Sequence, residues 1–198
     1  RHAVTPYDKN QTGPNPTQPL NHSDRQLFMT GLGMCGWLAT CLRFDIKYAY
    51  SAIASGMADP LNEHLHRLIR LISYLSGTTN MSVHSNLNPT KQIQDAVDMN
   101  ATGDRFKAYC DANKGGEFDG PDKGRPRYGF ILVMNGLPIL YKSTTVGVAI
   151  ADPKLEESHV DTSTGATETY AIGNFTHALL SLKHKCHDLG IDWPTPLT

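Results

Sequence analysis

The stretch Gly129–Lys142, GFILVMNGLPILYK, contains two apolar runs that flank one polar pair. The first run extends from Gly129 to Met134, and the second extends from Leu137 to Lys142. The pair between them, Asn135-Gly136, readily adopts the positive φ angles that a two-residue hairpin turn needs. The stretch therefore predicts a β-hairpin of two antiparallel strands.

The segments on either side of the hairpin extend this prediction. Phe106–Cys110 alternates loosely between apolar and polar residues and ends at Asp111, which is typical of a strand. After an irregular stretch at 143–162, apolar positions recur at helical spacing from about 164 to 189, and Gly190 ends this pattern. Within residues 104–198 the sequence thus predicts an α+β layer, in which three antiparallel strands are covered by one long helix.

The first part of the chain has a helical pattern. Residues 1–22 contain four prolines and predict an extended, poorly ordered lead-in. Residues 23–77 predict a small unit of three helices, and the polar stretch 78–103 predicts a connection. A capping box is expected at Ser23 and Gln26, a second helix is expected from near Asp45, and Asp59-Pro60 are expected to start the third.

Apolar residues in the helical part are expected to be buried. The run from Leu27 to Leu42 contains three glycines and is too short to span a membrane, so we expect a buried helix and no membrane partner. Four aromatic residues at core spacing are also expected to pack inside, namely Trp37, Tyr48, Tyr50 and Tyr74.

The composition narrows the protein class without deciding it. Of 198 residues, 39% are hydrophobic and 19% are charged, and the net charge is −1, which neither suggests nor excludes a nucleic-acid partner. The four cysteines form no CxxC pair, which argues against a structural zinc site or a disulfide scaffold. The chain begins without Met and without an apolar signal-peptide core, so we expect a segment of a longer protein.

Two carboxylates are candidates for chemistry. Asp111 follows the first predicted strand, and Glu168 falls in the first turn of the predicted long helix. Rigidly held carboxylates are the ligands that hard divalent cations prefer. Each also has an ordinary structural explanation, because an Asp often ends a strand in a turn and a Glu often complements a helix dipole.

Four stretches, in order, resemble the end of a copia-type retrotransposon polyprotein. The first, Ala39–Ala49 with Ser51, is similar to a family block in which Pro usually stands at Phe44. The second contains Asp59-Pro60 and Tyr74–Thr78. The third contains Ala108–Ala112, followed by Tyr128–Phe130, Pro138 and Ile139, and the fourth is Val160–Glu168 with Ala171.

The resemblance implies a reverse transcriptase thumb or connection segment at 23–77, followed by a partial ribonuclease H-like domain. It implies cleavage of the RNA strand of an RNA–DNA hybrid, with Asp111 and Glu168 as catalytic residues and ligands of Mg²⁺ or Mn²⁺. The rest of the parent polyprotein is the implied partner. The implied location is cytoplasmic, inside virus-like particles, or nuclear.

Departures from the family pattern limit the expected activity. Asn113 and Lys114 replace the usual Asp-Trp, and about fifteen extra residues precede the block that contains Glu168. The family's third catalytic Asp belongs to a strand after the long helix, and Asp192 stands too early for that role. We therefore expect an incomplete active site with little or no nuclease activity in this segment alone. The alternative is a decayed or domesticated copy that only binds nucleic acid or protein.

Other polar groups have simpler interpretations. The basic stripe of His64, His66, Arg67 and Arg70 is expected to be a solvated helix face, with contact to a template–primer backbone as the alternative. Four residues near the chain end suggest a zinc cluster, but only part of the set shares one helix face, namely His177, His184, Cys186 and His187. A charged loop is the default interpretation of Lys123, Arg125 and Arg127, with approach to a phosphate backbone as the alternative.

Overall fold

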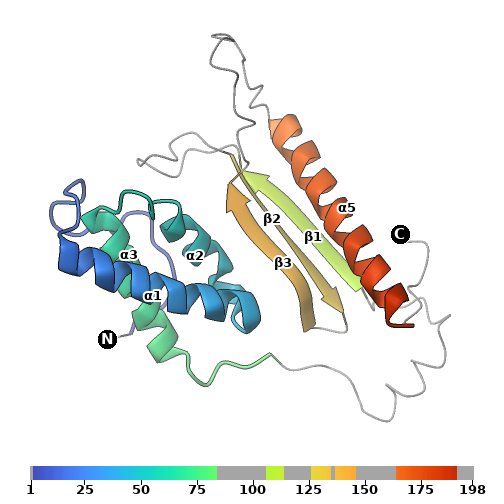
Figure 1. The fold of residues 1–198 in the computed structure, drawn as a ribbon, viewed down its shortest axis with the longest axis horizontal. Coiled ribbons are helices and arrows are strands. Elements are labelled where there is room, and N and C mark those ends of the chain that lie inside the picture. Colours follow the sequence, from blue (N-terminus) through green and yellow to red (C-terminus); the bar gives the residue numbers. More distant parts are fainter. Residues whose placement is uncertain (1, 84–105, 114–125, 135–136, 146–163, 191–198) are drawn as a thin grey trace, which may run out of the picture.

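A computed structural model describes residues 2–83, 106–113, 126–134, 137–145 and 164–190. In these ranges the chain is a mixed α+β protein, as the sequence predicts, with a helical unit at 2–83 and a three-stranded antiparallel sheet that packs against one long helix. Figure 1 shows the helical unit on one side of the sheet and the long helix on the other. No helix among the described residues is long and apolar enough to cross a membrane.

The helical unit contains α1 (His22–Cys41), the 3₁₀ turn η1 (Phe44–Ile46), α2 (Lys47–Ala54) and α3 (Asn62–Gly77). These elements enclose one apolar core, whose fully buried large side chains are Phe28, Ile46, Ile53, Leu68 and Leu71. Packing around this core stabilises the three helices, since an amphipathic helix gains most of its stability from packing.

The expectation of a buried first helix is wrong for most of its surface. Phe28, Leu32, Cys35 and Ala39 lie on the inner face of α1, at the spacing of helical turns. The outer face is apolar but exposed, and Trp37, which we expected to pack inside, is 61% exposed. Tyr74 is buried as expected.

The helix starts also differ from the sequence interpretation. The cap of α1 is Asn21 and not Ser23, because the Asn21 side chain accepts a hydrogen bond from the backbone N–H of Asp24 at 2.9 Å. α3 begins two residues after Pro60, and its N-cap is Leu61, whose backbone N–H donates to Nδ1 of His64 at 3.0 Å. Asp59, which we expected at the start of this helix, stands two residues before the N-cap, and His64 in the first turn binds the N-cap N–H instead.

A polar network joins η1 to the end of α3. The Arg43 guanidinium donates two hydrogen bonds of 2.8 Å to the Asp45 carboxylate and reaches the backbone carbonyl of Thr78. The Tyr74 hydroxyl donates to the same carboxylate at 3.0 Å. Burial acts to raise the pKa of Asp45, but the hydrogen bonds from Arg43 and Tyr74 and the charge of Arg43 outweigh it, so this pKa is lowered.

The lead-in departs from the expectation of a poorly ordered segment. Its residues lie along α3, where the Ala3 backbone N–H donates to the Ser73 hydroxyl at 3.1 Å. Arg70 donates to the carbonyl and the hydroxyl of Thr5 at 3.1 and 2.9 Å. Polar side chains of α3 thus form hydrogen bonds with backbone and side-chain groups of the proline-rich segment. The backbone groups of this segment need such partners because the segment is neither a helix nor a strand.

The sheet consists of β1 (Phe106–Asn113), β2 (Arg127–Met134) and β3 (Leu137–Thr145), antiparallel in the order β1-β2-β3. The predicted pairing of the two apolar runs is therefore confirmed, while the Asn135-Gly136 turn lies outside the described residues. A register shift at Leu132/Val133 places Val133 opposite Pro138. Pro138 has no N–H to donate, which fits a break in the ladder at this point.

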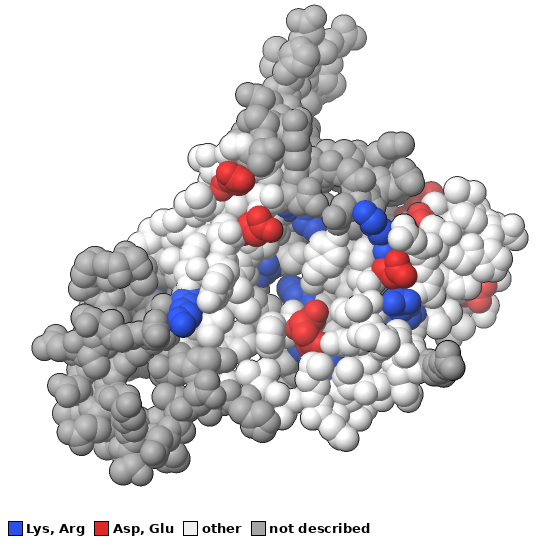
Figure 2. Space-filling view, turned by 180° about the vertical axis from the view of Figure 1, so that it is seen from behind, with Lys and Arg blue, Asp and Glu red and all other residues white. Residues whose placement is uncertain are grey.

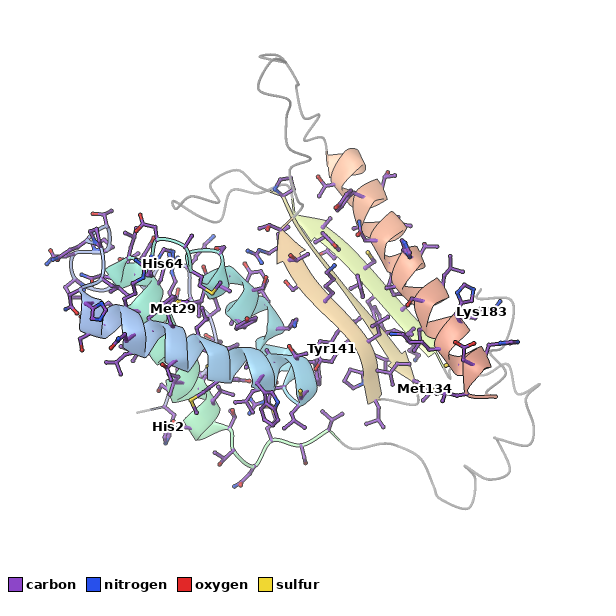
Figure 3. The ribbon with its side chains drawn as sticks, viewed as in Figure 1. His2, Met29, His64, Met134, Tyr141 and Lys183 are labelled. Carbon is purple, nitrogen blue, oxygen red and sulfur yellow. The ribbon has the colours of Figure 1, made fainter. Side chains whose placement is uncertain are left out.

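The two faces of the sheet have different partners. Tyr128, Phe130 and Leu132 alternate along β2 and pack against α5 (Thr164–Asp188), where they meet Ala171 and Phe175. The residue before Tyr128 faces the helical unit: Arg127 donates to the Ser51 hydroxyl at 2.6 Å. From β3, the Tyr141 hydroxyl donates to the carbonyl of Thr40 at 2.8 Å (Figure 3). The sheet is thus enclosed between two helical layers.

Candidate carboxylate site

Asp111 lies two residues before the end of β1, which extends to Asn113, so the strand is longer than the sequence suggested. Its side chain is exposed, and one carboxylate oxygen accepts from the backbone N–H of Ala112 at 2.9 Å. The residue opposite it in β2 is Gly129, which has no side chain to cover the carboxylate. Asp111 is therefore open to a ligand from solvent.

Glu168 is the fifth residue of α5, just beyond the first turn in which we expected it. It is exposed as well. The favourable interaction between an acidic side chain and the helix dipole falls off within the first turn. The structural explanation of Glu168 as a dipole partner is accordingly weaker than the sequence alone suggested.

The two carboxylates lie at the same end of the α/β layer. Figure 1 shows the carboxyl end of β1 and the amino end of α5 next to one another. The Tyr170 ring meets the Tyr128 ring edge-on, with centroids 5.6 Å apart, and Tyr128 pairs with Ala112, the neighbour of Asp111. Strand alternation, however, directs Asp111 to the face opposite α5, because Ala112 packs on the α5 side.

The chemistry available to this pair is that of hard-cation ligands. Two exposed carboxylates from a strand and a helix fit a divalent cation, although a tightly held ion needs more oxygen ligands than two side chains supply. Within the described ranges, no group of three or more His, Cys, Asp and Glu side chains is arranged to hold a metal. Asp192, which we did not assign, lies outside these ranges.

Asp111 also borders a cavity of about 520 Å³ between the helical unit and the sheet. We call this cavity the inter-unit groove. Its polar and aromatic lining residues come from η1, α2 and all three strands, and they include Phe44, Lys47, Tyr48, Tyr109, Arg127 and Tyr141. Figure 2, which views the molecule from behind, shows Lys and Arg side chains set into the hollow in the middle of that face.

Several residues of the inter-unit groove were missed or misinterpreted from the sequence. Arg127 was assigned to a charged loop, but it is the first residue of β2, it is 7% exposed, and its guanidinium lies 5.8 Å from the ring centre of Tyr48. Lys47 was not singled out. It opens α2, and partial burial lowers the pKa of its ammonium group. Tyr48 was expected in the core, yet it borders the cavity.

The structure also places the other polar residues that the sequence singled out. The basic stripe on α3 is not a solvated face, because His64 and Arg67 are 3% and 6% exposed and Arg67 pairs with Glu63 at 3.0 Å. On α5, His177, His184 and His187 are exposed and Cys186 is half-buried. Lys123 and Arg125 lie outside the described residues.

Comparisons with family models, with curated proteins and with solved structures find no match for this chain.

Proposed function

We propose that the chain belongs to the reverse transcriptase and ribonuclease H region of a copia-type retrotransposon polyprotein. In this proposal the helical unit is the end of the reverse transcriptase, and β1–β3 with α5 are the part of a ribonuclease H-like domain that carries two carboxylates. The observation that supports it is the order strand, hairpin, helix, with Asp111 and Glu168 at the same end of the layer.

The proposed reaction is metal-dependent hydrolysis of the RNA strand in an RNA–DNA hybrid. Asp111 and Glu168 would hold Mg²⁺ or Mn²⁺, which supplies an activated water and stabilises the leaving oxygen. Both carboxylates are exposed, which leaves room for a phosphodiester. Because Asp111 is directed away from α5, a cation shared with Glu168 would require the two side chains to turn toward one another. A two-metal site needs a further bridging carboxylate, so these 198 residues alone are expected to have little or no activity.

A gel assay on a fluorescent RNA–DNA hybrid with Mg²⁺ or Mn²⁺ tests the proposal. A longer parent protein that adds a strand with a third Asp should cleave the hybrid, and Asp111→Asn and Glu168→Gln should each abolish cleavage in it. Asp188→Asn, which changes an exposed carboxylate at the far end of α5, is the matched control and should leave cleavage intact. Cleavage that survives Asp111→Asn would contradict the assigned roles.

A decayed or domesticated copy that only binds nucleic acid or protein is the second candidate. The orientation of Asp111 away from α5 favours it, because strand alternation directs this carboxylate to the sheet face that α5 does not cover. The same longer protein separates the two candidates: hybrid binding without cleavage, at any divalent cation concentration, supports the binding module and contradicts the nuclease.

A further inference from the structure

We propose that a second cavity, between α1 and α3, binds a neutral and largely apolar organic molecule that carries one hydroxyl group. This cavity belongs to the helical unit, and the described residues that line it include neither Asp111 nor Glu168. The inference is therefore independent of nuclease activity and of nucleic-acid binding. We call this site the α1/α3 cavity.

Three segments of the helical unit form the walls of the α1/α3 cavity. Most of the lining side chains are apolar, and they come from α1, from α3 and from the segment 79–83, which is light green after α3 in Figure 1: Met34, Leu38, Ile72, Leu75, Met81 and Val83. The backbone N–H of Met81 donates to the carbonyl of Thr78 at 3.1 Å, which holds the third wall in a turn. A Cβ at Gly31 would lie 3.2 Å from Cδ2 of Leu68, so this glycine lets α1 and α3 approach closely where they line the cavity.

The size of the α1/α3 cavity suits a small organic molecule. Its volume of about 1020 Å³ stands at the upper end of the range of about 300–1,000 Å³ that ligand pockets occupy. Two of its wall residues, Met34 and Ile72, are 67% and 45% exposed in the free protein. A ligand that covers them removes apolar surface from water, which provides a hydrophobic driving force for binding.

The charges in the walls favour a neutral ligand. Among the described residues that line the α1/α3 cavity, only Arg43 and Asp45 carry a charge, and their salt bridge of 2.8 Å makes the pair neutral overall. An ionised headgroup would lose water in these apolar surroundings without gaining an unpaired charge of opposite sign, which is unfavourable. A neutral molecule avoids this cost.

The same pair provides a place for one hydroxyl group. The side chains of Arg43 and Asp45 remain 14% and 22% exposed although they are bonded to each other. A hydroxyl group can donate a hydrogen bond to the carboxylate and accept one from the guanidinium, so it would join the network without breaking the salt bridge. This polar end and the apolar walls together match an alcohol with a long apolar body.

The test is the binding of Nile red, a neutral fluorescent dye, to the full chain, followed by its displacement with dodecanol, dodecanoate or dodecylammonium. These three molecules have the same apolar tail and differ in the charge of the headgroup. Dodecanol should displace the dye at concentrations about tenfold lower than either charged molecule requires. Stronger displacement by a charged molecule, or dye binding that does not saturate, would overturn the proposal.

Two substitutions on α3 locate the site. Ile72→Asp places a charge in the cavity wall and should weaken the binding of dodecanol by about tenfold. The matched control is Ile69→Asp, since Ile69 is 53% exposed on the same helix and does not line the cavity. This control should leave binding unchanged, and equal weakening by both variants would overturn the proposal. Circular dichroism of each variant ensures that only folded proteins are compared.

Asp45→Asn tests the argument from charge. This variant leaves Arg43 without its negative partner, so the affinity for dodecanoate should rise about tenfold relative to dodecanol. An unchanged ratio of the two affinities would contradict the role of the pair. Sedimentation velocity of the full chain examines a different occupant: a dimer that Ile72→Asp dissociates, without dye binding by the wild type, would show that a second copy covers the cavity and would overturn the proposal.

Discussion

The helical unit and the α/β layer are held together in different ways. In the helical unit, directed polar contacts such as the Arg43–Asp45–Tyr74 network and the Glu63–Arg67 pair surround an apolar core. In the α/β layer, apolar side chains on one face of the β-sheet pack against α5. Among them, the rings of Phe130 and Phe175 lie 5.1 Å apart between their centres. A fully satisfied polar network specifies one arrangement of the helices, whereas α5 is held on the sheet mainly by apolar packing.

The largest expected effects come from removing one core aromatic from each unit. Phe28→Ala and Phe130→Ala should each cost about 3–5 kcal/mol in the unit that contains it, because both side chains are buried and leave a cavity. Hydrogen exchange followed by mass spectrometry reports each unit separately. If either variant lowered hydrogen-exchange protection equally in the helical unit and in the α/β layer, the two would unfold as one cooperative unit and would not differ in the way described above.

The next effect concerns the polar network of the helical unit. Asp45→Asn should cost about 1–3 kcal/mol, because the partly buried guanidinium of Arg43 loses its charged acceptor. The same residue predicts a pH dependence. The folded-state pKa of Asp45 is lowered from 3.8, so its stabilisation is complete above that value and is lost as the pH falls through the lower folded-state pKa. Urea unfolding between pH 2 and 6 should show a larger loss of stability in the wild type than in Asp45→Asn.

A smaller effect is expected between the two units. Tyr141→Phe removes the hydrogen bond to the Thr40 carbonyl and retains the ring packed near Phe44, so it should cost about 0.5–1.5 kcal/mol. Compared with the wild type, this variant should show faster amide hydrogen exchange near the end of α1 and unchanged exchange in α5. Unchanged exchange at both places would mean that the hydroxyl contributes nothing to the contact between the units.

The smallest effect tests the outer face of α1. Trp37→Gln should change the free energy of unfolding by less than about 0.5 kcal/mol, since the side chain is 61% exposed. Phe28→Ala, nine residues earlier on the inner face, is the natural comparison. A loss of several kcal/mol with Trp37→Gln would show that this face is covered in solution.

Local signals in the sequence predicted most of the α/β layer. The period-two pattern and Asn135-Gly136 located β2 and β3 to within three residues, and the long helix was placed almost to its observed bounds. The third helix was also found, because its apolar residues recur at i, i+3 and i+4 up to Gly77. These elements follow from contacts between residues that are near one another in sequence.

Features that depend on distant residues were not predictable. The burial of Arg127 results from Ser51 and Tyr48, which are more than seventy residues away. The lead-in is placed by side chains of α3, and prolines alone indicated only an extended chain. The sequence marked Asp111 and Glu168 by position, but the face that Asp111 occupies depends on strand register, which a single sequence does not define.

The course of the lead-in brings the first residues of the helical unit back to the end of α3. The His2 ring lies 3.0 Å from the Ser76 hydroxyl, so the chain arrives and leaves at neighbouring points. Units with adjacent ends tolerate insertion into other proteins and circular permutation. The helical unit thus has the connectivity of a transferable module, in which a short linker would join residue 2 to residue 77 and the chain would be opened elsewhere.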